Sequence, residues 1–414
     1  MTAAATISDD RDKVYVTAPL IPTQEGPEGI RFDFNDGARV QFPKRESGSW
    51  RVTLHDLDAG VVLYHGDLKS GQLQSTKRYF LRYGIKITSV SEDGDLSDVM
   101  DYEFSPTGQI ILVHIPVGTL GDAIAWFSYV PRFAEEMSAR IICIMAAPLI
   151  GLFRDRYPEI EFLAMADVEN SGLVDQAYAT YRIGLFFTDT DNNWQPSDFR
   201  HVGLHKTAAY ILGVSPEETK PAISVPDASR PIAERYVCIA TQASSQCKYW
   251  NNPDGWRTVI AFLKKQGLRV ICIDQKATHG KGWVWNHIPH GCEDETGDRP
   301  LQERARWLTH CEFFIGTSSG LAWLAWAAGA RVVLISGFTH PTNEFYTPYR
   351  VINWNSCNSC WNDQKITFDH KNIFWCPRHE NTDRQFECSR LITPEAVIAT
   401  IQRIPSMSSD RGVK

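Results

Sequence analysis

The chain has 414 residues, 43% hydrophobic and 22% charged, a balance typical of folded globular proteins. Its formal net charge of −7 argues against a general nucleic-acid binder, because neutralising a phosphate backbone requires surplus Lys and Arg. No stretch approaches the roughly 18 uninterrupted apolar residues of a membrane span, and the N-terminus shows no export signal. The sequence therefore predicts a cytoplasmic protein of two or three domains, without a membrane span.

The first hundred residues lack long helical periodicity. Short segments of alternating polarity, such as IRFDF, WRVTLHDL and VVLYHGDL, are separated by Gly, Asp, Asn and Pro. This pattern is typical of a small antiparallel β domain, which we expect over residues 1–105. Such a domain is suited equally to binding and to assembly.

From about residue 106, strand-like and helix-like segments alternate. The segments GQIILVHIPV, ARIICIMA, EIEFLAMA and YRIGLFFT are expected strands, and GDAIAWFSYVPRFAEEMS, GLFRDRYP and VGLHKTAAYILGV are expected helices. This alternation favours an α/β fold with a parallel sheet covered by helices on both faces. We expect a first Rossmann-like domain over residues 106–225, ending in the Pro- and Ser-rich linker SPEETKPAISVPDASRPI.

A second alternating unit is expected over residues 226–414. Its strands are predicted in RYVCIAT, LRVICID, EFFIGTSS and ARVVLISG, and its helices in WRTVIAFLKKQG, LQERARWLTHC and GLAWLAWAAG. Two such domains joined by a linker would enclose a cleft at the carboxyl ends of their strands, where open α/β sheets bind ligands.

The turn GTLGDAIAW follows the first strand of the first α/β unit. Gly118 and Gly121 would let the backbone approach a ligand closely and leave N–H groups free at the start of a helix. The turn matches neither the dinucleotide-binding glycine pattern nor the P-loop, so neither NAD nor ATP hydrolysis is implied. Asp122 has two interpretations: an acid of the first helical turn that complements the helix dipole, or a general base facing the cleft.

Two segments of the second unit are suited to phosphate. Residues 317–320 place small hydroxyls and glycine before a helix of small and apolar residues, which suits a pyrophosphate as well as an ordinary capped turn. The segment TQASSQCKYW places Lys248 after another strand, where it would neutralise a phosphate or remain a solvated charge. Taken together, these turns fit a nucleotide-diphosphate ligand.

Four of the ten cysteines gather in one segment at about residues 353–390, here called the cysteine finger. They are Cys357, Cys360, Cys376 and Cys388, and the first two have Cys-x₂-Cys spacing. Four thiolates suit tetrahedral metal coordination. Two disulfides are disfavoured in a reducing cytoplasm, and unrelated free thiols are disfavoured by the clustering. Zinc is the default metal for such ligands, with His379 as an alternative ligand. A closed site of this kind is structural.

The turns and the KYW segment resemble the lipopolysaccharide-type heptosyltransferases over most of residues 106–350. The Gly-Asp turn of that family corresponds to Gly121 and Asp122, and its ASS/TT-x-K-x-W segment corresponds to residues 244–250. Its diphosphate-binding G-x-D-[ST]-G-x-x-H turn corresponds to residues 316–323.

This chain departs from that pattern at Ser318, where the family often has Asp, and at Trp323, where it often has His. Together with the leading β domain and the cysteine finger, these departures resemble the bacterial autotransporter heptosyltransferases, a resemblance that covers the whole chain. It implies a GT-B fold and transfer of heptose from ADP-heptose to serine hydroxyls of autotransporter adhesins before export. It also implies iron in the four-cysteine finger, with zinc as the alternative, and a homo-oligomeric ring of twelve subunits.

Under this resemblance Asp122 corresponds to the catalytic base. Serine is a poor nucleophile at neutral pH, and a positioned base contributes typically about 10²–10⁴-fold. No acidic DxD motif is placed to hold a catalytic metal, so Lys248 and the helix that begins near residue 320 are expected to meet the leaving ADP. The residues expected to contact the substrates are Thr119, Leu120, Gly121, Ser244, Ser245, Lys248, Thr317, Ser318, Ser319, Gly320, Leu321 and Ala322.

Two other functions remain open. One is a different GT-B glycosyltransferase, with another sugar or a lipopolysaccharide-core acceptor, and the departures at Ser318 and Trp323 leave it open. The other is a non-catalytic, metal-dependent scaffold for adhesins. Asp274 would either meet a ribose or form a turn, and residues 276–290 would be either a solvated loop or a lid over the substrate.

Overall fold

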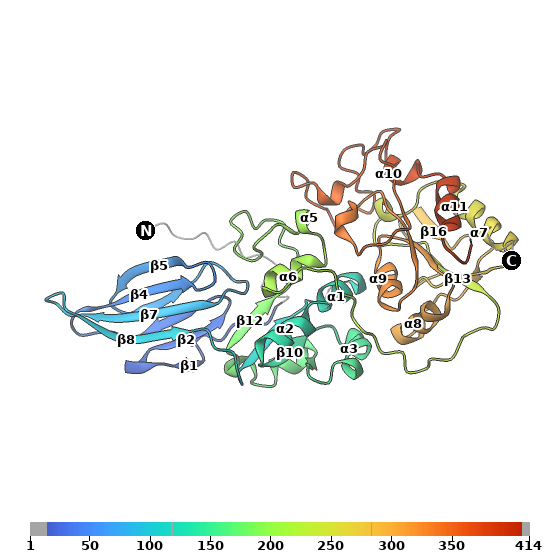
Figure 1. Cartoon of the computed structure of the whole chain (residues 1–414). Helices are drawn as coiled ribbons and strands as arrows, with labels where there is room; N and C mark the ends of the chain where they lie inside the picture. Colours follow the sequence, from blue (N-terminus) through green and yellow to red (C-terminus); the bar gives the residue numbers. More distant parts are fainter. Residues whose placement is uncertain (1–14, 117–118, 283, 408–414) are drawn as a thin grey trace.

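The computed structural model describes residues 15–116, 119–282 and 284–407. The N-terminal strands, a first α/β unit and a second α/β unit follow one another in a row (Figure 1). No helix in the described part of the chain is long and apolar enough to span a membrane.

The N-terminal part contains an antiparallel sheet of order β5-β4-β7-β8. Its strands are β4 (Ser49–Asp56), β5 (Val61–Leu68), β7 (Tyr83–Val90) and β8 (Leu96–Glu103). Trp50, Val52 and Leu54 alternate with partly exposed residues along β4, as expected for a strand with one face on a core. The expected β-rich N-terminal region is confirmed.

The remaining N-terminal strands belong to a sheet that continues into the first α/β unit. They are β1 (Gln24–Glu25), β2 (Arg31–Asn35), β3 (Arg39–Phe42) and β6 (Gly71–Gln74). Strand β2 pairs in parallel with β12 (Ala179–Arg182), and the sheet order is β11-β10-β9-β12-β2-β3-β6. Hydrogen-bonded strands thus cross the boundary expected at residue 105, and the division into three domains stays a prediction.

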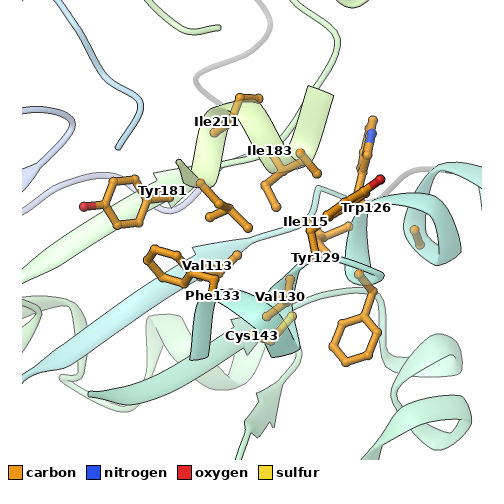
Figure 2. Close-up of a cluster of buried hydrophobic side chains, with 14 of the residues drawn as sticks. Val113, Ile115, Trp126, Tyr129, Val130, Phe133, Cys143, Tyr181, Ile183 and Ile211 are labelled. Carbon is orange, nitrogen blue, oxygen red and sulfur yellow. The ribbon is translucent and has the colours of Figure 1, made fainter. Parts of the chain in front are cut away.

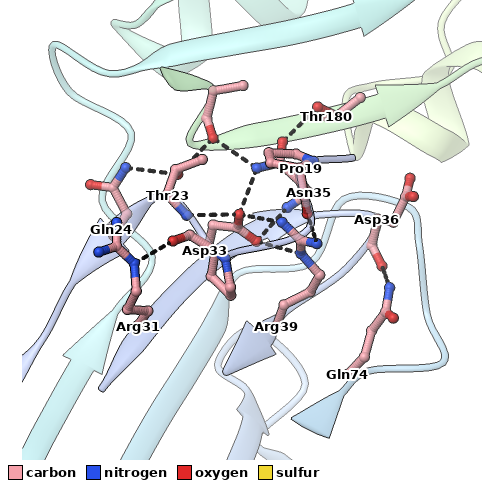
Figure 3. A network of polar contacts seen from close by, with 12 residues as sticks. Pro19, Thr23, Gln24, Arg31, Asp33, Asn35, Asp36, Arg39, Gln74 and Thr180 are labelled. Carbon is pink, nitrogen blue, oxygen red and sulfur yellow. Dashed lines mark hydrogen bonds and ion pairs between the residues drawn. The ribbon is translucent and has the colours of Figure 1, made fainter. Parts of the chain in front are cut away.

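A buried polar network fixes the join between β2 and β12 (Figure 3). Arg39 donates from Nε and Nη2 to the two oxygens of Asp33, at 2.8 and 2.6 Å. Asn35 donates to Asp33 at 2.8 Å and accepts from the Thr180 hydroxyl at 2.6 Å. Buried charges are tolerated where they are paired and hydrogen-bonded, and this network specifies one register for the two strands.

In the first α/β unit the parallel strands lie in the order β11-β10-β9-β12, which is 3-2-1-4 in chain order and Rossmann-like. The strands not yet bounded are β9 (Ile110–His114), β10 (Arg140–Ile144) and β11 (Glu161–Leu163). The helices are α1 (Leu120–Phe127), α2 (Val130–Met137), α3 (Ala147–Phe153), α4 (Met165–Glu169), α5 (Phe199–Val202) and α6 (Lys206–Leu212).

The single helix expected from GDAIAWFSYVPRFAEEMS is wrong. The segment forms α1 and α2, and Pro131 stands in the first turn of α2, where its missing N–H is tolerated. Trp126 on α1 and Phe133 on α2 both pack into the core that covers β9, together with Val113 and Tyr181 (Figure 2). The break therefore lets both helices bury apolar faces on one sheet.

The second α/β unit has a fully parallel sheet of order β17-β14-β13-β18-β19-β20, which is 3-2-1-4-5-6 in chain order. Its strands are β13 (Tyr236–Ala240), β14 (Arg269–Cys272), β17 (Glu293–Asp294), β18 (Phe314–Thr317), β19 (Val332–Ile335) and β20 (Arg350–Val351). Its helices are α7 (Gly255–Lys265), α8 (Leu301–His310), α9 (Gly320–Ala327), α10 (Glu387–Arg390) and α11 (Pro394–Gln402).

The segment 276–290 is not a plain loop. It contains the antiparallel hairpin β15 (Thr278–Lys281) and β16 (Val284–His287). His279 on this hairpin lies 2.7 Å from the Tyr249 hydroxyl, and Asn286 donates to Gln246 at 3.0 Å. The hairpin is therefore tied to the loop that follows β13.

Candidate functional site

The two α/β units meet where α1 and α9 begin. A Cβ added to Gly121 would lie 2.8 Å from Cδ1 of Trp323, and one added to Gly320 would lie 3.1 Å from the backbone N of Gly121. Only glycine permits so close an approach. Each helix start has N–H groups without intrahelical partners and a positive dipole end, so the contact gathers two such ends. Both helices follow strands beside the switch points of their sheets, where α/β folds bind ligands.

Asp122 is the third residue of α1, and Thr119 is the N-cap. The Thr119 hydroxyl and backbone N–H both donate to the Asp122 carboxylate, which makes half of a capping box. Burial is the largest influence and raises the pKa of Asp122, while the Thr119 hydrogen bonds and the Lys248 ammonium counteract part of that rise. The side chain keeps a partly exposed surface. The first-turn role of Asp122 is thus confirmed, and the role as base stays a prediction compatible with it.

Lys248 is the last residue of the 3₁₀ turn Gln246–Lys248 after β13, and its positive charge lowers the pKa of Asp122. Its Nζ lies 5.4 Å from the ring centroid of Phe338, 5.6 Å from that of Trp361 and 5.4 Å from that of Phe368. In the described part of the chain this ammonium forms no ion pair with a carboxylate. An ammonium held by aromatic faces keeps its charge available to an anion.

The two serines before Lys248 differ. Ser244 is exposed, whereas Ser245 is buried and its hydroxyl donates to the Ile373 carbonyl at 2.9 Å. The predicted contact of Ser245 with the substrate would therefore require exchange of an existing hydrogen bond. In this structure Ser245 fastens the β13 loop to the cysteine finger.

The turn before α9, residues 317–320, carries hydroxyls of two kinds. Those of Thr317 and Ser319 are buried and have no partner among the described residues. Such a group costs about 1–3 kcal/mol and calls for a ligand or an ordered water. The Ser318 hydroxyl instead donates to Oε1 of Glu344 at 2.5 Å, and Glu344 is paired with Arg350 at 2.9 Å. Thr317 and Ser319 are thus better placed than Ser318 to bind an anion.

The flanking residues of the predicted set line the helix starts. Leu120 and Leu321 are partly exposed at the two first turns, and Ala322 is buried. Trp323 packs against Phe345, with ring centroids 4.9 Å apart, and against His205 at 5.6 Å. Trp323, at the position where the family often has His, therefore places an apolar ring in the contact between the two units.

Asp274 is hydrogen-bonded within the protein. Its buried carboxylate accepts from the backbone N–H and the hydroxyl of Thr241, at 2.8 and 2.9 Å, and from the Gln242 N–H at 3.3 Å. These bonds join the loops after β13 and β14. These contacts are not those of a turn-forming residue, since they reach a different loop, and the contact with a ribose stays a prediction.

Sequence reasoning missed Glu344 and the three rings around Lys248. Glu344 has no motif, and it reaches Ser318 only because the chain returns past β19. Trp361 and Phe368 lie within the cysteine finger, far from Lys248 in the sequence. An apolar residue directly after Cys360 was the available signal.

In the described part of the chain, one group of at least three metal-type side chains has ligand atoms within 4.8 Å of one another: Cys357, His379 and Glu387. Both oxygens of Glu387 are engaged, since Arg384 donates to each, at 2.7 and 2.8 Å, and the Cys357 N–H donates to Oε1 at 2.9 Å. Glu387 is therefore a weaker candidate ligand than the thiol or the imidazole.

The other finger thiols lie near this group. Burial and then the Cys357 thiol raise the pKa of Cys360 to about 12, and Cys376 adds to the rise. Burial and the thiols of Cys360 and Cys376 likewise raise the pKa of Cys388. Adjacent thiolates repel one another, and a bound metal cation reverses that cost. Thiol and imidazole groups are donors that a metal ion can bind. The four-cysteine site stays a prediction, because the group just described contains only Cys357 of the four predicted thiols.

Two stretches match known families. Residues 26–91 match the N-terminal domain of glycosyltransferase TibC, and residues 200–373 match glycosyltransferase family 9 (heptosyltransferase). The autotransporter heptosyltransferase BAHTCr of Citrobacter rodentium is 49% identical over 400 residues, which cover 97% of this chain and 95% of that protein.

Crystal structures of TibC from enterotoxigenic Escherichia coli are also similar. They are 48% identical to this chain and cover 94% of it and 99% of TibC, with TM-scores of 0.87 and 0.88. TibC is described as an iron-containing, dodecameric glycosyltransferase, and one of these structures is a complex with ADP-D-beta-D-heptose.

A further relative, BimC of Burkholderia thailandensis, is 42% identical over 94% of this chain and 89% of its own length, and it is named an inactive autotransporter heptosyltransferase. A protein named inactive is therefore among the relatives of this chain. From these identities over almost its full length, the chain belongs to the autotransporter heptosyltransferases of glycosyltransferase family 9.

Proposed function

We propose that this chain transfers heptose from ADP-heptose to serine hydroxyls of an autotransporter adhesin. The observation that carries the proposal is the convergence, near the contact of α1 and α9, of a carboxylate, an ammonium and two hydroxyls. Among the described residues the ammonium has no carboxylate partner, and the hydroxyls have no hydrogen-bond partner. Asp122 supplies the carboxylate and Lys248 the ammonium, and Thr317 and Ser319 supply the hydroxyls. An acceptor hydroxyl would find a base there, and a diphosphate would find a positive charge and hydrogen-bond donors.

In the proposed reaction the acceptor serine oxygen attacks the anomeric carbon of the heptose. The bond from that carbon to the diphosphate oxygen breaks, and its electron pair leaves with ADP. The serine proton passes to Asp122, which must be ionised to accept it. Lys248 favours the ionised carboxylate, and with the free N–H groups of α9 it would stabilise the charge that develops on ADP.

The relatives support the wider assignment. TibC was crystallised with ADP-heptose and is dodecameric. We propose the same donor for this chain, an adhesin passenger domain as acceptor, and assembly into a ring of twelve. Modification of a passenger before its export would place the chain in the cytoplasm.

We further propose a structural metal in the cysteine finger, held by Cys357, Cys360, Cys376 and Cys388. Iron is favoured because TibC contains iron, and zinc is the alternative. The metal would cross-link the finger without entering the reaction. Cys376→Ser should lower metal content measured by elemental analysis, whereas Cys311→Ser, outside the finger, should leave it unchanged. Equal metal content in both variants would exclude the finger as the site.

The experiment that tests the function is intact mass spectrometry of a purified passenger fragment incubated with this chain and ADP-heptose. Increments of one heptose unit with the wild-type chain, and their absence with Asp122→Asn, are expected. Binding of ADP-heptose without an increment on any passenger would favour another acceptor, such as a lipopolysaccharide core. Absence of donor binding would exclude the transferase.

A non-catalytic adhesin scaffold is the second candidate, and the similarity to BimC favours it. Under that function Asp122→Asn would leave adhesin binding and export unchanged, and loss of the finger cysteines would abolish them. The transferase predicts the opposite order for product formation, with Asp122→Asn the more damaging change.

A further inference from the structure

Three aromatic rings surround the ammonium of Lys248. Phe338, which follows β19, and Trp361 and Phe368, which lie in the cysteine finger, form what we call the aromatic box. Its ring centroids lie 5.3 to 5.6 Å from one another and 5.4 to 5.6 Å from Nζ of Lys248. All three rings are buried, and Trp375 packs against both Phe338 and Phe368.

The finger also holds the backbone beside Lys248. The carbonyl of Ile373 accepts from the Ser245 hydroxyl and from the Gln246 N–H, both at 2.9 Å. The loop is therefore fastened before Lys248, and the side chain is fastened at its tip. The backbone attachment and two of the three rings at the tip belong to the cysteine finger.

A partner of this kind has a specific electrostatic consequence. A carboxylate beside Lys248 would neutralise the ammonium, whereas an aromatic face attracts it through the ring quadrupole and leaves its net charge in place. A flexible lysine is also costly to immobilise when it binds an anion. An aromatic box removes part of that cost in advance without cancelling the charge.

We propose that Phe338, Trp361 and Phe368 are positioning residues that hold the Lys248 side chain oriented for the diphosphate of the donor, so that the cysteine finger sets the affinity for that group. This inference rests on the proposed function, because it takes the nucleotide-diphosphate as the ligand of Lys248. It adds a role for the finger at the donor site.

Phe368→Leu tests the inference, because leucine keeps apolar volume and removes the ring face. The matched control is Phe199→Leu, the same change at a buried ring that lies 6.0 Å from Trp361 in the same cluster and does not border Lys248 in the described part of the chain. ADP and adenosine are titrated calorimetrically into the full-length wild type and both variants.

The ADP affinity of Phe368→Leu should fall about threefold to tenfold, as expected for one cation–π contact, with adenosine affinity unchanged. Phe199→Leu should leave both affinities unchanged, and Phe368→Tyr, which keeps the ring, should restore ADP binding. Equal losses for ADP and adenosine, or equal losses in the Phe368→Leu and Phe199→Leu variants, would overturn the inference in favour of a purely structural role. Failure of the wild-type chain to bind ADP would overturn the proposed function itself.

Discussion

The helix starts of α1 and α9 touch, yet they carry different chemistry. At α1 the charged group, Asp122, is already bonded to its own N-cap, Thr119. At α9 the groups are neutral, and the hydroxyls of Thr317 and Ser319 have no partner among the described residues. The charged side chain at the α1 start already has a partner and can accept a proton, while the two hydroxyls at the α9 start have none among the described residues and can donate hydrogen bonds. The α1 start is therefore suited to proton transfer, and the α9 start is suited to binding an anion.

Asp122→Asn should have the largest effect, because it removes the proposed base. Turnover should fall by about 10²–10⁴-fold, with ADP affinity nearly unchanged because the binding groups lie at α9 and Lys248. The asparagine oxygen can still accept from Thr119, so the helix start is kept. Initial rates and an ADP titration measure both effects, and a variant with near-normal rates would remove Asp122 from the reaction.

The pH dependence follows from the same carboxyl. Burial raises the pKa of Asp122 in the folded chain, so wild-type turnover should fall with decreasing pH already above the usual range of an aspartate. Because the unfolded chain loses this proton at a lower pH than the folded chain, the free energy of unfolding falls as pH rises from the usual aspartate pKa to the raised one, and the full cost is present above it. Asp122→Asn should therefore unfold at no lower urea concentration than wild type at neutral pH.

Lys248→Met should have the next largest effect, on binding. The apolar stem can remain in the aromatic box, but the charge is lost, and ADP affinity should fall by roughly 10- to 100-fold, as for a charged hydrogen bond. The acid limb of the rate profile should move to higher pH, since Lys248 lowers the pKa of Asp122. Lys264→Met, at an exposed lysine that donates to the Gly291 carbonyl, is the control, and equal affinities in the two variants would contradict the assignment.

Gly320→Ala should push the two helix starts apart. Its Cβ would lie 2.9 Å from Cβ of Leu120 and 3.1 Å from the backbone of Gly121, and such overpacking costs about 1–3 kcal/mol. The control is Gly151→Ala in α3, whose Cβ would meet only the flexible end of Gln302, at 2.6 Å.

Alanine gains helix propensity at both glycines, so the difference between these variants isolates the close contact. Urea denaturation should show lower stability for Gly320→Ala alone, with turnover reduced alongside. Similar stabilities would mean that the helix starts can separate without strain.

Thr317→Val should have the smallest effect and should separate binding from stability. The lost hydroxyl has no partner among the described residues, so the ligand-free chain should keep its stability or gain up to about 1 kcal/mol, while ADP affinity falls a few-fold. Thr339→Val is the control, because its buried hydroxyl bonds Ser336 at 2.9 Å and its loss should cost about 1 kcal/mol. A stability loss at Thr317 as large as that at Thr339 would contradict the binding role.

Local sequence patterns were enough to predict much of the fold. Strand-helix alternation predicted both α/β units, and Thr119-x-x-Asp122 is a capping pattern that could be seen in the sequence. The break before α2 was missed because apolar periodicity continues through Ser128 and Tyr129, and only Pro131 marks it. The candidate site was predicted as three turns, each readable by itself. The aromatic box was not, because residues 338, 361 and 368 approach Lys248 only through the fold of the finger.

The shared sheet has a consequence for the evolution and dissection of the molecule. Because β12 pairs with β2, the N-terminal strands act as a permanent cover for an otherwise open edge of the catalytic half. A fragment that starts near residue 106 would expose the backbone of β12 and leave the Thr180 hydroxyl without Asn35. Exposed edges of that kind pair with other chains. The N-terminal strands therefore protect the first α/β unit from self-association.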